Sequence, residues 1–390
     1  MSHCILMVAG YMGGLKKAWR SLGFQVFEDA IIKLSPAEIE NRIGRWKAQR
    51  DIAYVFSFDF LPAIAEACFR HQLSYISWIV DSPHSVLWSK AAFYPTNVIF
   101  HFDYLEYQEL REAGNEQVYY LPLRTDSPFF TRMIEQTNEQ SVQRFRHDVA
   151  FMGNLYDKEP HNLYDKISYL PTYVSGYLEG IIAAQRKVWG CNLVHSAIME
   201  SVWRALRENI ILELESSFDS RVYQSFVEGI IHKKIAQLER KEVCSYLAEH
   251  FDFVLYSGSD TTYDQQIRNG GYIDYLKEMP LVFRHSKINI NITLHGINTG
   301  IPLRVLDILA CGGFCLTNYQ EEIGTYFEDG VELVMYSDFQ DMYEKISYYL
   351  VHEEERKAIA QAGYEKIKKQ FEYIHGVEEI VTVLGNVRNR

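Results

Sequence analysis

Short apolar runs alternate with longer amphipathic stretches over residues 1–145 of the chain. Apolar runs rich in Val, Ile, Tyr and Phe predict strands, and the segments between them have the length and periodicity of helices. This alternation predicts a parallel sheet with helices on both faces. The predicted strands are Cys4–Ala9, Phe24–Phe27, Ile52–Phe58, Tyr75–Val80, Val98–Phe102 and Val118–Leu121.

A polar stretch at residues 131–147 is interpreted as the link to a second domain, where the alternation starts again. Residues 160–250 interrupt it with an almost entirely helical pattern, which predicts a helical insertion. We therefore expect an N-terminal domain over residues 1–145, a C-terminal domain over residues 146–375 and a terminal helix and tail over residues 376–390. The main strands predicted in the second domain are Asp148–Met152, Phe253–Tyr256, Tyr272–Tyr275, Lys287–Thr293 and Glu332–Tyr336.

The second domain is organised around one stretch, Lys287–Asn318. Polar and apolar residues alternate over Lys287–Thr293, which predicts a strand with one solvent-facing side. A loop with two glycines follows, and then a short helix over Leu303–Ala310, which Gly312 and Gly313 end. The stretch therefore predicts strand, loop, helix, tight turn and strand.

This stretch has the features of a phosphate site. A glycine loop that runs into a helix presents free backbone N–H groups and the positive end of the helix dipole. Arg304 adds a guanidinium group in the first helical turn, and Asp307 could accept hydrogen bonds from sugar hydroxyls. Lys287 could add a second cation. The alternative is an ordinary surface ion pair between Arg304 and Asp307, with Lys287 simply solvated.

Polar residues also follow the strands of the first domain, where ligands of parallel sheets bind. Asp81 and His84 follow the fourth predicted strand, and a catalytic base would be expected at such an edge. Asp81 could instead cap a turn, and His84 could be an ordinary loop histidine. The loop at residues 9–14, which includes Gly13, could approach a ligand or be a plain turn.

The stretch that begins GIPLRVLDILACGGFCLTN resembles the C-terminal domain of CgeB-like (spore-maturation-protein-like) glycosyltransferases. The upstream pieces WIVDSP and DVAFMGNLYD are similar to the N-terminal region of the same group. The resemblance implies an α/β fold of the GT-B type, with two Rossmann-like domains facing a cleft. It also implies that the nucleotide-sugar donor binds the C-terminal domain and that the acceptor faces the N-terminal one.

The resemblance implies further site residues. Gly153 and Asn154, in the turn after the first strand of the second domain, would face the donor phosphates, although a plain turn is an equal alternative. Asn298, Thr299 and Gly300 would lie at the same site. Related retaining enzymes carry two glutamates eight residues apart here, where this chain has Thr299 and Asp307. The stereochemical outcome therefore stays open, and an inverting enzyme would need a base such as Asp81.

Composition narrows the range of partners. The net charge is −12, and no block of Lys and Arg stands out, which argues against nucleic acid and against docking on anionic lipid. The six cysteines are scattered, and the histidines show no metal-ligand spacing. No signal peptide is recognisable, and no apolar run approaches the roughly 20 residues of a membrane span. We expect a cytoplasmic protein without bound metal or cofactor. Its oligomeric state cannot be inferred.

The function predicted from these features is transfer of a sugar from a nucleotide-sugar donor to a hydroxyl of a glycan or protein. UDP is the first guess for the nucleotide. The alternatives are a GT-B-like nucleotide-sugar epimerase and a non-catalytic scaffold that binds sugar nucleotides or glycans.

Overall fold

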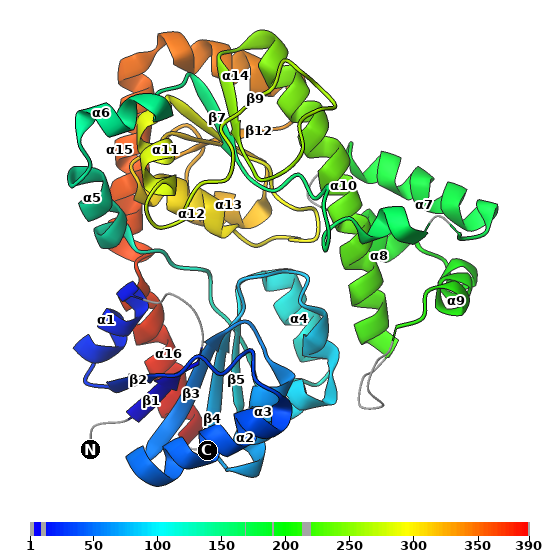
Figure 1. Cartoon of the computed structure of the whole chain (residues 1–390), viewed down its shortest axis with the longest axis vertical. Coiled ribbons are helices and arrows are strands. Elements are labelled where there is room, and N and C mark those ends of the chain that lie inside the picture. The colour runs from blue at the N-terminus through cyan, green and yellow to red at the C-terminus, as the bar shows by residue number, and fades with distance from the viewer. Residues whose placement is uncertain (1–3, 9–12, 168, 189–190, 213–219, 389–390) are drawn as a thin grey trace. The chain divides into compact units, whose positions relative to one another are not determined.

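The computed structural model describes residues 4–8, 13–167, 169–188, 191–212 and 220–388 (Figure 1). The chain forms two compact units. Unit 1 comprises Met1–Arg124, Glu213–Phe226 and Phe371–Arg390, and unit 2 comprises Thr125–Leu212 and Val227–Gln370. Each unit contains one six-stranded sheet, so the predicted α/β class with two sheets is confirmed.

The sheet of unit 1 has the strand order β2-β1-β3-β4-β5-β6, and every pair is parallel. All six predicted strands are present, with ends that shift by no more than two residues: β1 (Cys4–Met7), β2 (Gln25–Glu28), β3 (Ile52–Phe58), β4 (Ser74–Trp78), β5 (Asn97–His101) and β6 (Val118–Tyr120). The helices of this unit are α1 (Gly13–Ser21), α2 (Pro36–Arg50), α3 (Pro62–Arg70), α4 (Tyr104–Glu112) and α16 (Tyr373–Arg388), with 3-10 turns η1 (Ser85–Trp88) and η2 (Lys90–Phe93).

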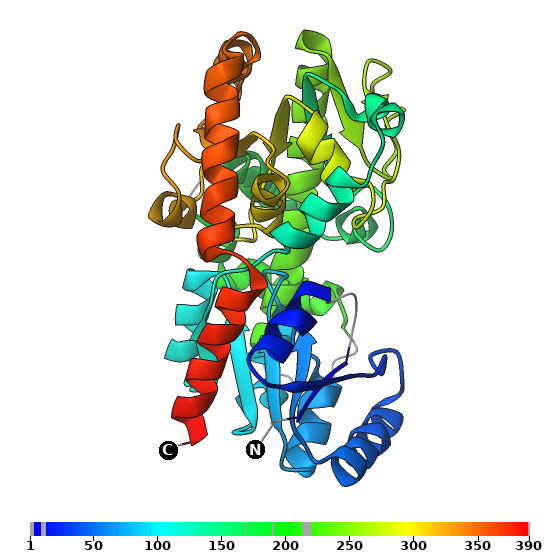
Figure 2. The ribbon, with the colours of Figure 1, turned by 90° about the vertical axis from the view of Figure 1, so that its left-hand side faces the viewer.

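Helices cover both faces of the unit 1 sheet, and the core lies between them and the strands. Ile64 and Cys68 of α3 and Ile43 of α2 pack on one face, where they are fully buried. On the other face α16 packs against α1, and the two helices lie side by side in Figure 2. A Cβ atom on Gly376 would come within 2.4 Å of the Trp78 ring, so α16 can lie this close to β4 only with glycine there. The C-terminal residues Phe371–Arg390 therefore belong to unit 1.

The sheet of unit 2 has the strand order β12-β11-β10-β7-β8-β9 and is also parallel throughout. Its strands are β7 (Val149–Met152), β8 (Phe253–Tyr256), β9 (Arg268–Asn269), β10 (Ile288–Asn291), β11 (Cys315–Asn318) and β12 (Val334–Tyr336). The helices around it are α5 (Ser127–Glu135), α6 (Glu139–Val142), η3 (Gln143–Phe145), α11 (Met279–His285), α12 (Leu303–Ala310), α13 (Glu321–Tyr326), α14 (Phe339–Val351) and α15 (Glu353–Gln370).

The helical insertion consists of η4 (Leu163–Ile167), α7 (Thr172–Gln185), α8 (Leu193–Ala197), α9 (Glu200–Asn209) and the long helix α10 (Ser220–His250). α10 ends next to the sheet, since Val243 and Leu247 belong to the same hydrophobic cluster as Val149 of β7. In the part of the chain that the structure describes, no helix is both long and apolar enough to cross a membrane.

Three details of unit 2 differ from the sequence predictions. The segment Tyr272–Tyr275 is not a strand, and the edge strand is the earlier pair Arg268–Asn269. The Gly270-Gly271 pair that follows β9 breaks the strand pattern, because Gly271 takes a left-handed backbone with φ of 80°. Ser337, with Gln340 three residues later, fits the sequence pattern of an N-cap, but the cap of α14 is Asp338, whose side chain accepts the N–H of Asp341.

The prediction that one side of β10 faces solvent is also wrong. All four residues of β10 are buried, because the strand lies between β7 and β11 in the middle of the sheet. The side-chain N–H groups of its two asparagines donate to neighbouring buried groups. Asn289 Nδ2 donates to the carbonyl oxygen of Phe283 at 2.9 Å, and Asn291 Nδ2 donates to Thr317 Oγ1 at 2.9 Å. Alternation therefore reflects buried hydrogen bonding here and not contact with water.

The division between the units falls after Arg124, earlier than the expected boundary at residue 145. The stretch at residues 131–147, expected to be a link, is largely helical and contacts the helices of unit 2: α5 packs on α11 and α12, and η3 packs on α11.

Candidate active site

A cavity of about 350 Å³ lies at the carboxyl ends of β7 and β8 in unit 2. The turn after β7 and the segment Ser257–Ser259 after β8 form two of its walls. Tyr272 and Ile273 contribute another wall, and Arg304 of α12 reaches it from the helix N-terminus. Ligands of parallel sheets bind beyond the carboxyl ends of strands, so this is the expected position for a site.

The turn after β7 brings Gly153 and Asn154 into the cavity wall. Gly153 donates its backbone N–H to the carbonyl oxygen of Tyr256 at 3.1 Å, which ties the turn to the end of β8. A Cβ atom at Gly153 would lie 2.7 Å from the Phe151 ring, so the position requires glycine. Asn154 Oδ1 accepts the N–H of Tyr156 at 2.6 Å, which stabilises the turn.

Arg304 is a half-buried cation at the cavity. Among the residues that the structure describes, it forms no hydrogen bond or ion pair, and its nearest aromatic contact is the Phe283 ring, 6.0 Å from Cζ to the centroid. Burial and the nearby charge of Arg240 lower the pKa of Arg304, whereas Asp307 raises it. A partly desolvated guanidinium with unused donors in a cavity wall is suited to bind an anion.

Asp307 lies deeper than predicted. Its side chain is buried and does not line the cavity. Thr125 Oγ1 donates to Oδ1 at 2.7 Å, and Tyr275 Oη donates to Oδ2 at 2.7 Å. Burial raises the pKa of Asp307 to about 6, against the effect of these two donors and of Arg304. The arrangement makes Asp307 an anchor for Thr125 and Tyr275, and its contact with ribose stays a prediction.

The loop between β10 and α12 carries the other predicted donor residues. Asn298 lines a second cavity of about 10 Å³, which has room for a single water molecule. Thr299 Oγ1 donates to Glu322 Oε1 at 2.7 Å, so a carboxylate from α13 lies next to the position where related enzymes carry a glutamate. Gly300 is buried in the same loop.

Lys287 lies apart from these residues. It precedes β10, and its Nζ atom lies 2.6 Å from Oδ1 of Asp148, which itself precedes β7. Both residues are therefore at the amino ends of parallel strands, whereas the cavity is at the carboxyl ends. The structure brings together Gly153, Asn154 and Arg304, and it leaves Lys287 at the opposite edge.

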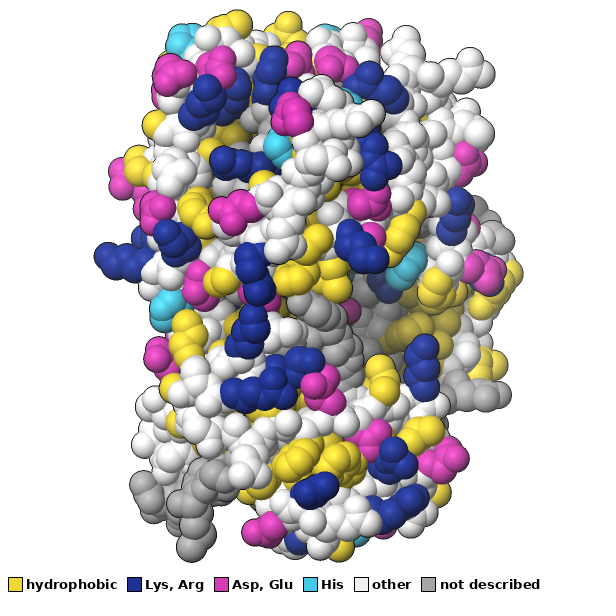
Figure 3. Space-filling view, turned by 60° about the vertical axis from the view of Figure 1, so that its left-hand side comes forward, with side chains coloured by type: hydrophobic (Ala, Val, Ile, Leu, Met, Phe, Trp, Pro, Cys, Tyr) yellow, Lys and Arg dark blue, Asp and Glu magenta, His cyan; other side chains and the backbone are white. Residues whose placement is uncertain are grey.

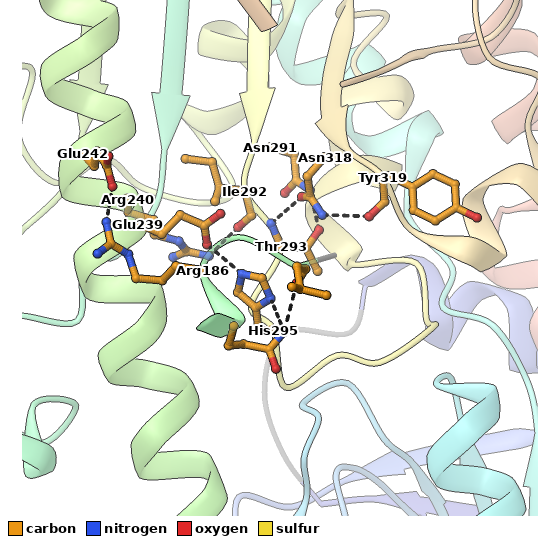
Figure 4. Close-up of polar contacts among 12 residues, drawn as sticks. Arg186, Glu239, Arg240, Glu242, Asn291, Ile292, Thr293, His295, Asn318 and Tyr319 are labelled. Atoms are coloured by element: carbon orange, nitrogen blue, oxygen red, sulfur yellow. Dashed lines mark hydrogen bonds and ion pairs between the residues drawn. The ribbon is translucent and has the colours of Figure 1, made fainter. Parts of the chain in front are cut away.

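Two residues of α10 hold the segment that follows β10 (Figure 4). Arg240 Nη2 donates to the carbonyl oxygen of Ile292 at 2.7 Å, and Glu239 Oε2 lies 3.2 Å from His295 Nε2. The side chain of Asn318, at the end of β11, accepts the N–H of Thr293 at 2.8 Å. This loop is therefore fixed from both sides before it reaches α12.

In unit 1, Asp81 and His84 follow β4, and both are held through their backbones. The N–H of Asp81 donates to Asp59 Oδ1 at 3.2 Å, while its side chain is exposed. The N–H of His84 donates to Glu106 Oε1 at 3.2 Å. The Nε2 atom of His84 lies 3.1 Å from the carbonyl oxygen of Phe60, so its ring is oriented by backbone as well.

A buried ion pair between His101 and Glu106 supports the loop that carries Asp81 and His84. Nε2 of His101 lies 3.3 Å from Oε2 of Glu106, and both side chains are almost fully buried. Burial alone would lower the pKa of His101, but the Glu106 carboxylate outweighs this effect and raises it. Glu106 also accepts the hydroxyl of Ser82 at 2.6 Å, so the pair positions the Asp81–His84 segment.

Two other predictions can be placed only in part. Gly13 is the first residue of α1, but residues 9–12 of the predicted loop lie outside the described residues. Among the residues that can be described, no group of three or more His, Cys, Asp or Glu side chains is arranged to hold a metal ion.

On the face drawn in Figure 3, acidic and basic side chains are mixed over the surface.

The sequence reasoning missed Arg240, Asp59 and Glu106. Arg240 lies on a helix whose pattern gave no indication of its target. Asp59 could have been noticed, since it directly follows β3 and the carboxyl ends of parallel strands share one edge. Its left-handed φ of 52° is unusual for a residue other than glycine.

Part of the chain matches a known protein family in sequence. Residues 235–382 match the model of a family described as glycosyl transferase-like, and this range includes β8, β10, α12 and the first part of α16. The C-terminal part of the chain is therefore glycosyl transferase-like in sequence. No curated protein shows detectable sequence similarity to the chain.

Solved structures show the same fold over the whole chain. A glycosyltransferase from Rickettsia africae ESF-5 has a TM-score of 0.52 at 8% identity, over 99% of this chain and 98% of that chain. Sucrose-phosphate synthase from Thermosynechococcus elongatus has a TM-score of 0.52 at 9% identity, over 99% of both chains. Anabaena HepE, solved in complex with UDP and glucose, has a TM-score of 0.50 at 9% identity, over 99% of this chain and all of its own. At these identities the likeness establishes the fold, which is GT-B.

Proposed function

We propose that the protein is a glycosyltransferase that moves a sugar from a nucleotide-sugar donor to a hydroxyl acceptor. The observation that carries this proposal is Arg304, a half-buried cation that lines the cavity at the carboxyl ends of β7 and β8 and has no partner among the described residues. The glycosyl transferase-like match over residues 235–382 and the UDP complex of Anabaena HepE support the same assignment.

The chemistry follows from the position of the cation. The donor diphosphate would accept hydrogen bonds from Arg304 and from the N-terminus of α12. As the sugar leaves, negative charge grows on the nucleoside diphosphate, and the same groups would stabilise that charge. The turn at Gly153 and Asn154 would form the wall of the cavity against the ligand.

The finer points belong to the same proposal. We take UDP as the first nucleotide to test, a glycan or protein hydroxyl as the acceptor, and hexosyl transfer in the manner of CgeB-like enzymes without a bound metal. Unit 1 would bind the acceptor, with the exposed Asp81 as the general base of an inverting reaction. His84 would orient the acceptor, since its ring is held by the Phe60 backbone.

The test measures the binding of UDP, GDP, dTDP and ADP by thermal shift and by calorimetry. A ligand at a hundred times its dissociation constant stabilises the native state by about 2.7 kcal/mol. We expect one nucleotide to bind the wild type and the Arg304→Gln variant to lose affinity by roughly 10- to 150-fold, because a charged hydrogen bond contributes about 1.5–3 kcal/mol.

The matched control is Lys357→Gln, which removes the same charge from an exposed pair with Glu353 on α15. If no nucleotide binds a folded wild type, or if both variants lose affinity equally, the proposal fails. If a nucleotide binds but no nucleotide sugar is consumed with or without an acceptor, the scaffold alternative replaces it. Consumption with a new sugar nucleotide as the product would indicate the epimerase.

A further inference from the structure

Three buried side chains of α10 contact the loops that follow β7 and β10. Gln237, Glu239 and Arg240 are 6%, 3% and 8% exposed, respectively. Gln237 Nε2 donates to the carbonyl oxygen of Tyr156 at 3.2 Å. Arg240 donates to two carbonyl oxygens, that of Asn154 through Nη1 and that of Ile292 through Nη2, each at 2.7 Å.

Glu239 completes the set through the ion pair with His295 that is drawn in Figure 4. Two consecutive residues of one helix therefore hold the loop that contributes Gly153 and Asn154 to the cavity and the segment that leads to Arg304. These three side chains are not among the described residues that line the cavity. Their effect on a ligand must therefore act through the backbone that they hold.

The geometry at Arg240 depends on a planar guanidinium. Its Cζ atom lies 4.9 Å from the centroid of the Tyr156 ring and 5.6 Å from that of Phe151. A fork of this kind can donate to two separate carbonyl oxygens while its face lies against an aromatic ring. A lysine would keep the charge, but it could not reproduce both bonds and the stacking.

The turn after β7 needs such support. Tyr156 has a left-handed backbone with φ of 56°, which non-glycine residues adopt only where surrounding contacts impose it. Here the contacts are the N–H of Tyr156 to Asn154 Oδ1, its carbonyl to Gln237, and its ring against Arg240. Loss of the contacts from α10 would allow the turn to relax, and with it the cavity wall at Gly153 and Asn154.

We propose that Gln237, Glu239 and Arg240 form an α10 clasp that positions both loops of the donor site, with Arg240 as its main positioning residue. This inference rests on the proposed function, since it assigns the clasp to the site that would hold the donor. It also gives the helical insertion a role. Besides burial, the charge of Arg240 lowers the pKa of Arg304, and an anion in the cavity would relieve this repulsion.

The experiment compares wild type with Arg240→Lys, Arg240→Met and the milder Gln237→Leu. Calorimetry measures affinity for whichever of UDP, GDP, dTDP and ADP binds the wild type, and hydrogen exchange by mass spectrometry follows residues 153–157 and 292–299. We expect both Arg240 variants to weaken binding at least tenfold and to speed exchange in both segments. Gln237→Leu should speed exchange in the first segment alone.

The matched control is Arg186→Met. Arg186 follows α7 and forms an ion pair with Glu242 of α10 (Figure 4). Among the described residues it forms no hydrogen bond with either loop, so affinity and exchange should stay at the wild-type level. Wild-type affinity in Arg240→Lys would show that charge alone matters and would overturn the clasp. Unchanged exchange in both segments would overturn it too. If the wild type binds none of the four nucleotides, the proposed function fails, and the exchange result still decides whether the clasp positions the loops.

Discussion

The carboxyl edges of the two sheets are built alike, but the predicted site residues at them make different contacts. Each sheet has six parallel strands, and in each most of the polar residues predicted from sequence lie in loops that follow strands, Lys287 being the exception. At the edge of unit 2 there is a cavity of about 350 Å³ with an unpartnered Arg304 among the described residues. At the edge of unit 1, the loop that carries Asp81 and His84 is held by Asp59, Phe60 and Glu106.

The difference separates two requirements of a group transfer. Binding a charged ligand requires donors that the protein has left unused, as in unit 2. Positioning a reactive group requires that its backbone and ring be held by neighbours, and under the proposed function Asp81 and His84 of unit 1 would be held in this way. We therefore expect substitutions at the unit 2 edge to change affinity for nucleotides, and substitutions at the unit 1 edge to change turnover.

The largest effect should come from Asp81→Asn. If Asp81 is the general base, its loss should slow transfer by about 10²–10⁴-fold, the range typical of removing a positioned base. Nucleotide affinity should stay the same, because Asp81 does not line the cavity. Steady-state kinetics and calorimetry on one preparation measure both. A parallel loss of nucleotide affinity would remove the distinction between the two edges.

Glu106→Gln should cost about 3–5 kcal/mol of stability, because it removes one partner of a fully buried ion pair. In the variant an NH₂ group also replaces one of the two carboxylate oxygens. Either the Ser82 hydroxyl or the His84 N–H therefore loses its acceptor. Urea unfolding measures the loss. The exposed pair of Lys16 and Glu28 provides the control, since Glu28→Gln should change stability by less than about 1 kcal/mol. Equal effects would mean that the buried pair does not hold the loop.

Gly153→Ala should cost about 1–3 kcal/mol, because the new Cβ atom would lie 2.7 Å from the buried Phe151 ring. It should also weaken nucleotide binding, since Gly153 lines the cavity. Gly258→Ala is the control within the same cavity wall, where a Cβ atom meets nothing within 4 Å. Thermal unfolding and calorimetry test both. Wild-type behaviour of Gly153→Ala would show that the turn can adjust.

The smallest effects are two opposite pH dependences within unit 2. Burial lowers the pKa of His232 to about 3, so the unfolded chain binds its proton first, and stability is lost as the pH falls below about 6.5. Burial raises the pKa of Asp307 to about 6, so the folded chain binds a proton first, and stability is gained as the pH falls from about 6 to 4.

Urea unfolding between pH 5.0 and 7.5 tests these signs. Relative to wild type, His232→Leu should gain stability as the pH falls and Asp307→Asn should lose it, with slopes of up to about 1.4 kcal/mol per pH unit. Slopes of the same sign in the two variants would contradict the assignment.

Sequence patterns predicted most of the scaffold and part of the site. The bounds of α12 and of β3 follow the hydrophobic periodicity exactly as expected for local signals, and Gly153, Asn154 and Arg304 meet at one cavity. The position of Lys287 could also have been deduced, because a residue before a parallel strand lies at the amino edge. The contacts of Asp307 with Thr125 and Tyr275 could not, since they join segments far apart in sequence.

Arg240 shows why the remaining residues of the site could not be predicted from the sequence. On a helix, an arginine that holds two loops has the same local pattern as a solvated one, and only the tertiary contacts distinguish them. The buried asparagines of β10 illustrate the same limit, since their pattern resembles that of a half-exposed strand.

The order of strands in unit 2 has a consequence for synthesis. β7 at residues 149–152 pairs with β8 at residues 253–256 and with β10 at residues 288–291, and the helical insertion lies between β7 and its first partner. A nascent chain must therefore extend past residue 256 before β7 can form a sheet pair, whereas β1 finds β2 after little more than 20 residues. Pairing between strands that are far apart in sequence forms slowly. Unit 1 should therefore begin to fold on the ribosome before β8 and β10, the partners of β7, have been synthesised.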